Sequence, residues 1–384
     1  MLKGFYLTLL MGPTVPVPAP QPVIDALTSA QVTISAGQAS GFQLTFAMSK
    51  KSPLNTQLLP IGAFDPGIRV ILVVTVNSLP TVLMDGIITQ HTVTPSNEPG
   101  QSTLAVTGQD ISLMMDLGNA GIIGGLLEAA IPFPNLPTVG IVELLLLKYA
   151  TYGIIPLVVP PLQVDVPLIT DGWPTKTSFD SDLNFLKSAA EDVGYVFYID
   201  PGPVPGTNIG YFGPEIRIGV PQPALNIDMD AETNVESLNF TYDGMAREQP
   251  VITIMDPITG KIPIPIPIPD VSILRPPLAL RPAPAMRMAQ LEDVADLDPI
   301  PAALLGIAAS AKPDAITGSG SLDVLRYGRP LKARQLVGVR GAGTAYDGLY
   351  YVSSVTHSIK RGEYKQNFSL AREGLISLAP GVIP

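Results

Sequence analysis

Residues 347–373 read DGLYYVSSVTHSIKRGEYKQNFSLARE, and this stretch has the most regular pattern in the chain. Two runs with the two-residue period of β-strands flank a polar turn at residues 360–363, where Gly362 can adopt the positive φ of a tight reversal. The faces of the two runs carry Tyr351, Val355, His357 and Ile359, and Tyr364, Phe368 and Leu370, respectively. Tyr350 and Val352 have the opposite parity, which predicts a β-bulge near residues 353–354. The stretch therefore predicts a long antiparallel hairpin.

The chain has 384 residues, and its composition is apolar for a protein that is not predicted to span a membrane. Hydrophobic residues make up 46% and charged residues 15%, the mean hydropathy is +0.32, and the formal net charge is −10. This length predicts two or three domains, and the apolar content fits either a large β core or surface buried against other subunits. The acidic balance argues against nucleic-acid or anionic-membrane binding. The lack of cysteine excludes disulfides and thiolate metal sites.

The N-terminal region predicts a series of strands. Residues 4–11 are interpreted as the first strand, because the apolar run is too short to span a bilayer and no signal-peptide cleavage site follows it. The proline-rich residues 13–22 predict an extended linker. Further strand patterns lie at 32–34, 42–46, 69–76, 82–93 and 102–108, and the third of these predicts a strand buried on both faces. Closure of these strands as a sandwich or small barrel would remove exposed sheet edges.

The middle of the chain carries the helical patterns. Asp110 is a suitable N-cap for a helix over residues 111–117. Apolar residues recur at three- and four-residue spacing over 138–152, which predicts a helix ended by Gly153. The clearest helical pattern runs from Ser178 to Gly194 and is followed at once by a strand over 195–199.

The C-terminal third returns to strands after a proline-rich excursion. Residues 233–242 and 331–339 have strand patterns. Residues 262–269 alternate isoleucine and proline, so every second residue lacks an amide donor and the segment is expected at a sheet edge or in an extended arm. Residues 250–313 are interpreted as an excursion that is either partly mobile or laid over a neighbouring subunit, with a short helix at 301–311.

The sequence predicts no catalytic residue, cofactor or metal site. The two histidines, His91 and His357, lie on predicted strands and are interpreted as structural, and neither a Gly-x-Ser-x-Gly elbow nor a zinc-helix motif occurs. The glycine-rich residues 118–125 lack a phosphate-binding pattern. The acids at 228–232 begin like a calcium loop but lack its glycine and its final glutamate. Trp173, Tyr195, Phe197 and Tyr198 could line a carbohydrate platform, although aromatic strands are more often core.

Three blocks of sequence resemble the phage late control protein D family, which supplies the baseplate hub of contractile tails and the hub half of valine-glycine repeat spike proteins. The first block is the turn at Asp110, and the second is the helix and strand over 181–198. The third is the closing hairpin. The residues that carry the resemblance are Asp110, Asp182, Phe185, Leu186, Gly194, Tyr195, Phe197, Gly348, Tyr350, Val352, Val355, His357, Gly362, Tyr364, Phe368 and Arg372.

This resemblance implies a mainly β fold with a few helices (α+β). It would contain two tail-tube-like β-barrel domains, at residues 1–118 and 233–384, and a helix-containing middle region at 119–232. The excursion at 250–313 would interrupt the second barrel. The implied function is that of a structural hub and not an enzyme, assembled in the bacterial cytoplasm as part of a tail-like particle.

The partners that the resemblance implies are two further copies in a homotrimer, the tail-tube protein, other baseplate components and a spike. No valine-glycine repeat follows the hairpin, so the trimeric spike is expected to be a separate protein. Acidic residues are expected to line the lumen of the ring. The alternative function is a secreted β-rich protein that binds carbohydrate or hydrolyses glycosides on the aromatic platform described above.

Overall fold

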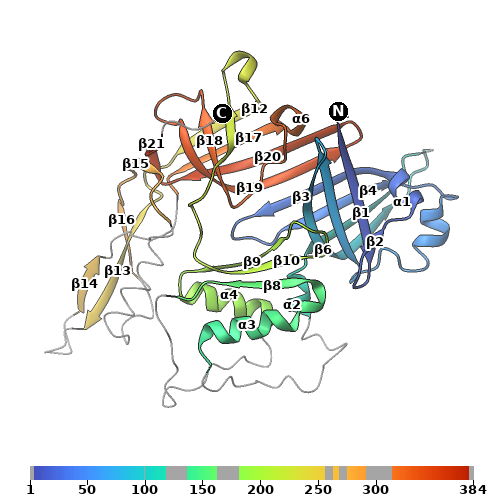
Figure 1. The fold of residues 1–384 in the computed structure, drawn as a ribbon, viewed down its shortest axis with the longest axis horizontal. Helices are drawn as coiled ribbons and strands as arrows, with labels where there is room; N and C mark the ends of the chain where they lie inside the picture. Colours follow the sequence, from blue (N-terminus) through green and yellow to red (C-terminus); the bar gives the residue numbers. More distant parts are fainter. Residues whose placement is uncertain are drawn as a thin grey trace.

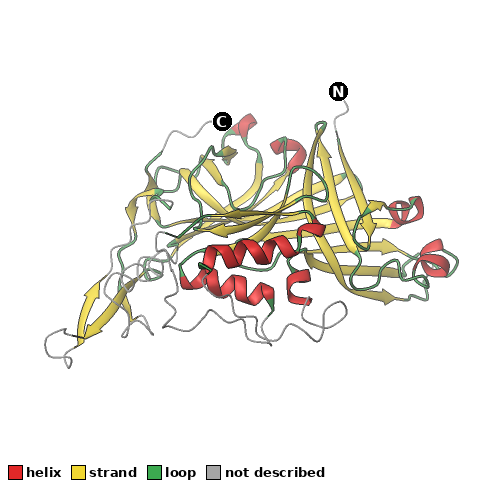
Figure 2. Ribbon diagram, turned by 60° about the horizontal axis from the view of Figure 1, so that its bottom comes forward, coloured by secondary structure: helices red, strands yellow, loops and turns green. Residues whose placement is uncertain are grey.

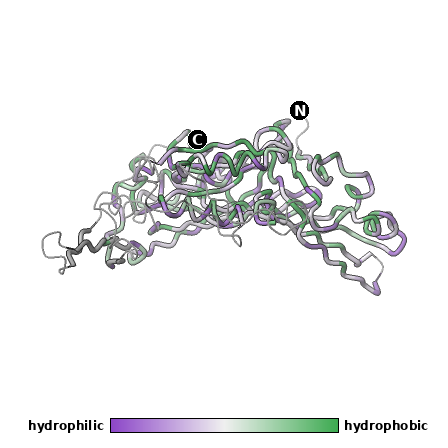
Figure 3. The backbone as a smooth tube through the Cα atoms, turned by 90° about the horizontal axis from the view of Figure 1, so that it is seen from below, coloured by the Kyte–Doolittle hydropathy of each residue, from purple (hydrophilic) through white to green (hydrophobic). Residues whose placement is uncertain are grey.

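The computed structural model describes residues 4–98, 100–117, 136–161, 181–255, 263–267, 275–290 and 314–379. These residues form mostly β-strands with a few short helices, which confirms the predicted fold class. Figure 1 shows a large twisted sheet, a layer with helices along one side of it, and a narrow arm of strands at one end. Seen from below, the molecule is arched (Figure 3).

The main sheet has thirteen strands in the described part of the chain. Its N-terminal half-sheet consists of β1 (Phe5–Gly12), β2 (Val17–Pro18), β3 (Leu27–Ser35), β4 (Gly41–Ala47), β5 (Arg69–Val76), β6 (Leu79–Thr94) and β7 (Thr103–Asp110). Its C-terminal half-sheet consists of β11 (Gln222–Asn226), β12 (Val235–Tyr242), β17 (Ile316–Asp323), β18 (Leu336–Arg340), β19 (Gly348–Lys360) and β20 (Glu363–Arg372). The two half-sheets join where β3 pairs with β19 in antiparallel register.

All six strands predicted in the N-terminal region are present. Seven of the eight residues of β5 are buried, as expected for a strand covered on both faces. The predicted linker at residues 13–22 is wrong, because β2 folds back on β1 and a short helix, α1 (Gln21–Ala26), follows it. Proline is compatible with both positions, since β2 lies at a sheet edge and Pro22 occupies the first turn of α1.

The helical layer has its own small sheet. Its helices are α2 (Leu113–Leu117), α3 (Thr138–Lys148) and α4 (Asp182–Asp192), and its strands are β8 (Ile154–Val158), β9 (Val196–Pro201) and β10 (Asn208–Gly213). Figure 2 shows the helices side by side along this layer. Gly153 and Gly194 have φ values of 75° and 67°, and each follows the end of a helical segment as the sequence predicts. Ser181 caps α4 through the amide of Asn184, and residues 178–180 lie outside the described residues.

Two hydrophobic cores correspond to these layers. The larger core contains residues of both half-sheets, and the rings of Phe5 on β1 and Tyr364 on β20 lie 5.5 Å apart within it. The second core lies between the helices and the small sheet and includes Leu146, Leu186 and Phe212. The boundaries predicted near residues 118 and 232 remain predictions, and β11 inside the predicted middle region pairs with β18 of the main sheet.

The arm is a separate sheet with the order β14-β13-β16. It consists of β13 (Glu248–Met255), β14 (Pro263–Pro267) and β16 (Arg287–Gln290), and at its base β15 (Ala279–Pro282) pairs with β21 (Gly374–Ser377). The isoleucine-proline alternation forms the edge strand β14, as expected. The helix predicted at 301–311 lies outside the described residues.

The remaining short helical segments are η1 (Leu54–Leu58), η2 (Ala150–Tyr152), η3 (Asp230–Glu232) and α6 (Val324–Tyr327). Among the described ranges, every helix is too short or too polar to span a lipid bilayer.

Candidate functional site

The closing hairpin is where the two half-sheets meet. A register shift between Val352 and Ser354 confirms the predicted bulge in β19. The bulge lies where β19 changes its partner on one side, since residues 348–351 pair with β18 and residues 354–360 pair with β3. The extra residue therefore lets one long strand belong to the C-terminal half-sheet at one end and reach the N-terminal half-sheet at the other.

The bulge also changes which side chains share a face. Tyr350 and Val352 lie in the same buried core as Val355 and Ile359. The predicted placement of Tyr351 on that face is wrong, because one inserted residue reverses the alternation of the strand. Tyr351 instead packs in a small separate cluster with Leu278 and Leu336.

Nine of the residues that carry the sequence resemblance lie in this hairpin. Gly348 and Gly362 have φ values of 112° and 79°, and a Cβ at Gly348 would lie 2.0 Å from that of Ser377. Position 348 therefore requires glycine, and the positive φ at Gly362 favours it. The buried side chains of the set are Tyr350, Val352, Val355, His357, Tyr364, Phe368 and Arg372.

Arg372 is fully buried at the base of the hairpin. Its guanidinium donates to three backbone carbonyls, those of Gly374 at 2.8 Å, Asp347 at 3.0 Å and Ala345 at 2.8 Å. It also lies 4.2 Å from the centre of the Tyr350 ring. Burial lowers the pKa of Arg372, and the nearby Tyr350 opposes part of this change. The side chain ties the end of β20 to the loop that precedes β19.

His357 belongs to a buried polar network on the other side of the bulge. Its Nδ1 lies 2.7 Å from the Tyr364 hydroxyl and 3.2 Å from Gln366 Nε2. The Gln366 amide also donates to the carbonyl of Leu331 at 2.9 Å. Because an amide nitrogen only donates, Nδ1 accepts and the ring proton is assigned to Nε2. His357 is thus held in the core by its contacts with Tyr364 and Gln366.

Acid is expected to destabilise the fold through His357. Burial lowers the pKa of His357 to about 3, whereas an unfolded chain would have the ordinary value of 6.5. Between these values the unfolded chain binds a proton that the native chain does not, so the free energy of unfolding falls as pH falls through this window. The slope from this one group approaches about 1.4 kcal/mol per pH unit. Denaturant unfolding between pH 7 and about pH 4 measures it.

The matched variant for this prediction is His357→Gln, which keeps an acceptor for the Tyr364 hydroxyl. The variant is expected to be less stable at pH 7. In the acid range, the slope of its unfolding free energy against pH is expected to be smaller, by up to the contribution of one bound proton. Equal slopes for the wild type and the variant would show that other groups cause the acid sensitivity.

The second group of resembling residues lies in the helical layer, apart from the hairpin. Leu186 is buried in the second core, and Phe185, Tyr195 and Phe197 pack against it. Asp182 is fully buried at the start of α4, where its carboxylate accepts from the Tyr149 hydroxyl at 2.6 Å and from Lys148 Nζ at 3.0 Å. These contacts join α3 to α4. The residues of this second group thus contribute to core packing or, for Asp182, to the contact between the two helices.

Asp110 ends β7 and does not cap a helix in the way predicted. Its two carboxylate oxygens accept from the amides of Ser40 and Ser112, both at 3.0 Å, and α2 begins only at Leu113. The extra residues between Asp110 and the helix form a turn, which is a common alternative role for aspartate.

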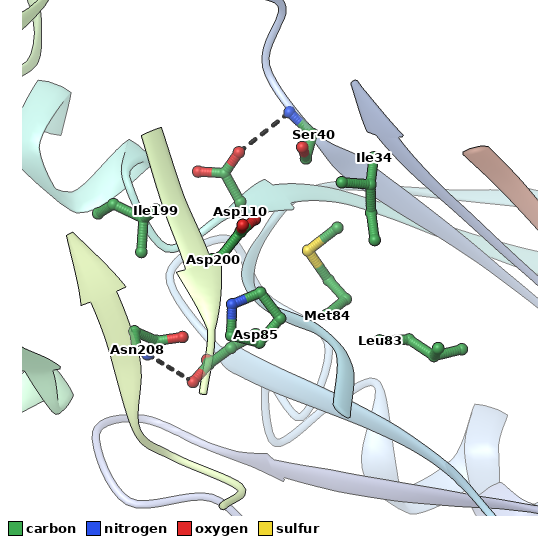
Figure 4. Close-up of a pocket in the computed structure, with 10 residues that line it drawn as sticks. Ile34, Ser40, Leu83, Met84, Asp85, Asp110, Ile199, Asp200 and Asn208 are labelled. Carbon is green, nitrogen blue, oxygen red and sulfur yellow. Dashed lines mark hydrogen bonds between the residues drawn. The ribbon is translucent and has the colours of Figure 1, made fainter. Parts of the chain in front are cut away.

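Asp110 lines a narrow cavity between the N-terminal half-sheet and the helical layer (Figure 4). The cavity volume is about 10 Å³. Polar groups on its wall come from Ser40, Asp85, Asp110, Asp200 and Asn208. The apolar part of the wall includes Leu83, Met84 and Ile199. This space is too small for a sugar or a cofactor.

An ion pair at the cavity wall joins the helical layer to the N-terminal half-sheet. Arg69 on β5 and Asp85 on β6 form two hydrogen bonds, of 2.7 and 2.6 Å, and both residues are almost fully buried. Asn208 on β10 donates to the same carboxylate at 2.8 Å. The Arg69 guanidinium also donates to the carbonyls of Tyr152 at 2.8 Å and Thr14 at 3.0 Å.

Arg334 connects the two half-sheets with the helical layer. It precedes β18, and its guanidinium donates to Asp200 on β9 and to the carbonyl of Ser35 at the end of β3, the latter at 2.7 Å. It also lies 4.2 Å from the centre of the Tyr198 ring. Burial raises the pKa of Asp200, and Arg334 opposes part of that rise. Neither Arg334 nor Arg69 was identified from the sequence, since no local pattern marks their partners.

The aromatic residues in and just before β9, at 195–198, do not share one face. Tyr195 and Phe197 pack against the core of the helical layer, whereas Tyr198 lies under Arg334 and beside Tyr211. Trp173 lies outside the described residues. In the parts of the chain that the structure describes, no group of three or more acidic or histidine side chains is arranged to hold a metal ion.

No family model and no curated protein matches this sequence. Solved structures do match. A tail protein from Neisseria meningitidis is 13% identical with a TM-score of 0.60, over 97% of this chain and 98% of that one. The 43 kDa tail protein of a Shewanella oneidensis prophage is 14% identical with a TM-score of 0.60, over 96% and 99%.

A third similar structure is a component of the type VI secretion system of E. coli. It is 12% identical with a TM-score of 0.51, over 94% of this chain and 77% of that one. That component itself exhibits structural similarity to T4 bacteriophage tail proteins. The chain therefore has the fold of these tail proteins over nearly its whole length.

Proposed function

We propose that this chain is a structural hub subunit of the baseplate of a phage-like tail or contractile injection system. The observation that carries the proposal is the end-to-end match with two tail proteins, each covered almost completely. The internal polar groups agree with a structural role. At the junction between the half-sheets and the helical layer, Arg69 and Arg334 are paired with acids of the same chain.

The arrangement of the sheets supports a ring of three chains. Each chain provides two β half-sheets joined edge to edge through β3 and β19. Three chains then place six comparable β modules around one axis, and such a ring can contact a hexameric tube on one side and a trimeric spike on the other. In this proposal the partners are the tail-tube protein, a separate spike and further baseplate components, and assembly takes place in the bacterial cytoplasm.

Light scattering coupled to size-exclusion chromatography tests the ring. One chain weighs 40.6 kDa. The purified protein alone is expected to have the mass of three chains, ~122 kDa. In a mixture with its tube and spike partners, the complex is expected to contain three hub chains. A species that remains a single chain in the presence of both partners would contradict the proposal.

The same sample can distinguish the hub function from the alternative function of carbohydrate binding. Two of the three aromatic rings at residues 195–198, those of Tyr195 and Phe197, pack against the core of the helical layer. We therefore expect no saccharide binding by calorimetry and no effect of Trp173→Ala on oligomeric mass. Saccharide binding that disappears in Trp173→Ala would favour the alternative function.

A further inference from the structure

The isoleucine-proline strand β14 has an unusual hydrogen-bonding geometry. It pairs antiparallel with β13 so that Ile264 lies opposite Ile254 and Ile266 lies opposite Ile252. The prolines at 263, 265 and 267 lie opposite Met255, Thr253 and Val251. In an antiparallel ladder, alternate residues exchange two hydrogen bonds with the partner strand, and the residues between them direct N–H and C=O away from it.

Proline decides which of the two sets faces β13. A proline has no N–H and cannot exchange two hydrogen bonds, so Ile264 and Ile266 must be the residues that bond to β13. The prolines are then the residues whose backbone points to the open side. Within the five residues of β14, the outer edge therefore presents carbonyl acceptors and no amide donor.

Such an edge cannot pair properly with another strand. A strand that approached β14 would find no donor for its own carbonyls over the length of three residue pairs. An ordinary exposed edge strand does the opposite, since its free donors and acceptors form a template for another chain.

The position of the arm makes this protection relevant. The arm projects from the end of the body, away from both hydrophobic cores (Figures 1 and 2). Its base is fixed by the Ala279 amide, which donates to Glu373 at 2.6 Å, and by Arg275, which lies 3.4 Å from Glu215. Arg247 also donates to the carbonyl of Ala283 at 3.1 Å. Among the described residues β14 pairs only with β13, so its outer edge is unpaired on this anchored arm.

We propose that Pro263, Pro265 and Pro267 seal the edge of β14 and prevent copies of this chain from joining through their arms by strand addition. This role does not depend on the hub function, because any soluble protein with an anchored, projecting strand pair would need it. The partner that the edge excludes is a second copy of the same arm, whose β14 edge would otherwise be self-complementary in antiparallel pairing.

The test restores the missing donors. A triple variant, Pro263→Thr, Pro265→Thr and Pro267→Thr, places three N–H groups on the outer edge and uses a residue that favours strands without adding apolar surface. Light scattering over a concentration series is expected to show at least a doubling of mass relative to the wild type, increasing with concentration. A dye that reports stacked strands is expected to gain fluorescence in parallel.

The matched control is Ile264→Thr with Ile266→Thr. It introduces the same residue type into the same strand, but these amides already bond to β13, so no outward donor is added. The control is expected to keep the wild-type mass. A triple proline variant with the wild-type mass at every concentration would overturn the proposal.

Unfolding of the body is distinguished by a second measurement. Since the arm lies outside both cores, the thermal midpoint of the body is expected to be the same in the wild type, the triple variant and the control. Association that accompanies a lowered midpoint of the triple variant would also overturn the proposal, because it would come from exposed core and not from a paired edge.

Discussion

Replacement of Asp85 by asparagine is expected to lower the free energy of unfolding by about 3–5 kcal/mol, the typical cost of leaving a buried charge without its partner. Arg69 and Asp85 are only 3% and 2% exposed. The amide removes the negative charge, and its NH₂ group would point a donor at Arg69 or at Asn208, which are themselves donors. Equilibrium unfolding in denaturant measures the loss.

The damage is expected to extend beyond the ion pair. The Arg69 guanidinium also holds the carbonyls of Tyr152 and Gly206, which belong to the helical layer. Tyr152 and Gly206 come just before β8 and β10 in the chain. Hydrogen exchange of the Asp85→Asn variant should therefore increase in β8 and β10 as well as in β5 and β6.

Two controls define the interpretation. The double variant Arg69→Met with Asp85→Leu removes both charges and keeps the volume, so it should be more stable than either single change. Glu236→Gln breaks only an exposed pair with Lys365 and should leave the denaturant midpoint unchanged. A wild-type midpoint for Asp85→Asn would mean that the pair does not hold the layers together.

Local patterns explain which parts of the fold could be predicted from the sequence. The parity change between Val352 and Val355 predicts the bulge, because strand alternation depends only on neighbouring residues. Gly153 and Gly194 end helices for the same reason, since the left-handed conformation they adopt is a local requirement. The alternating prolines predict an edge strand because each one removes a donor.

The wrong predictions come from the tertiary context. Proline content suggested an extended linker at residues 13–22, but the chain there can fold back on β1 because the first strand leaves an open edge. Tyr351 was placed on the core face by simple alternation, and the bulge moved it to the opposite side. Asp110 is a residue type that often caps helices. In the folded chain its carboxylate accepts a hydrogen bond from the amide of Ser40.

The junction of the layers could not be predicted because its members are far apart in sequence. Arg334 contacts Asp200 and Ser35, which lie 134 and 299 residues away. Asn208 contacts Asp85 over a separation of 123 residues. One sequence gives no signal for such pairs, since each residue alone has the appearance of an ordinary surface charge or amide.

Replacement of Arg372 by methionine is expected to lower the free energy of unfolding by at least about 3 kcal/mol, because three carbonyls would lose their donor in a site without access to water. Methionine fills much of the same volume, so the loss reports hydrogen bonding and stacking more than a cavity. Arg372→Lys should recover less than half of it, since an ammonium group lacks the planar fork that reaches all three carbonyls and lies against Tyr350. The exposed Arg326→Met is the control and should unfold like the wild type.

Arg372→Met and Asp85→Asn should increase hydrogen exchange in different parts of the chain. This difference distinguishes a local effect from general unfolding. Arg372 contacts only the base of the hairpin, so its loss should increase hydrogen exchange at residues 345–349 and 374–377 and leave β8 and β10 protected. The Asp85 variant should give the reverse pattern. If both variants exposed the same amides to the same degree, the half-sheets and the helical layer would unfold as one cooperative unit.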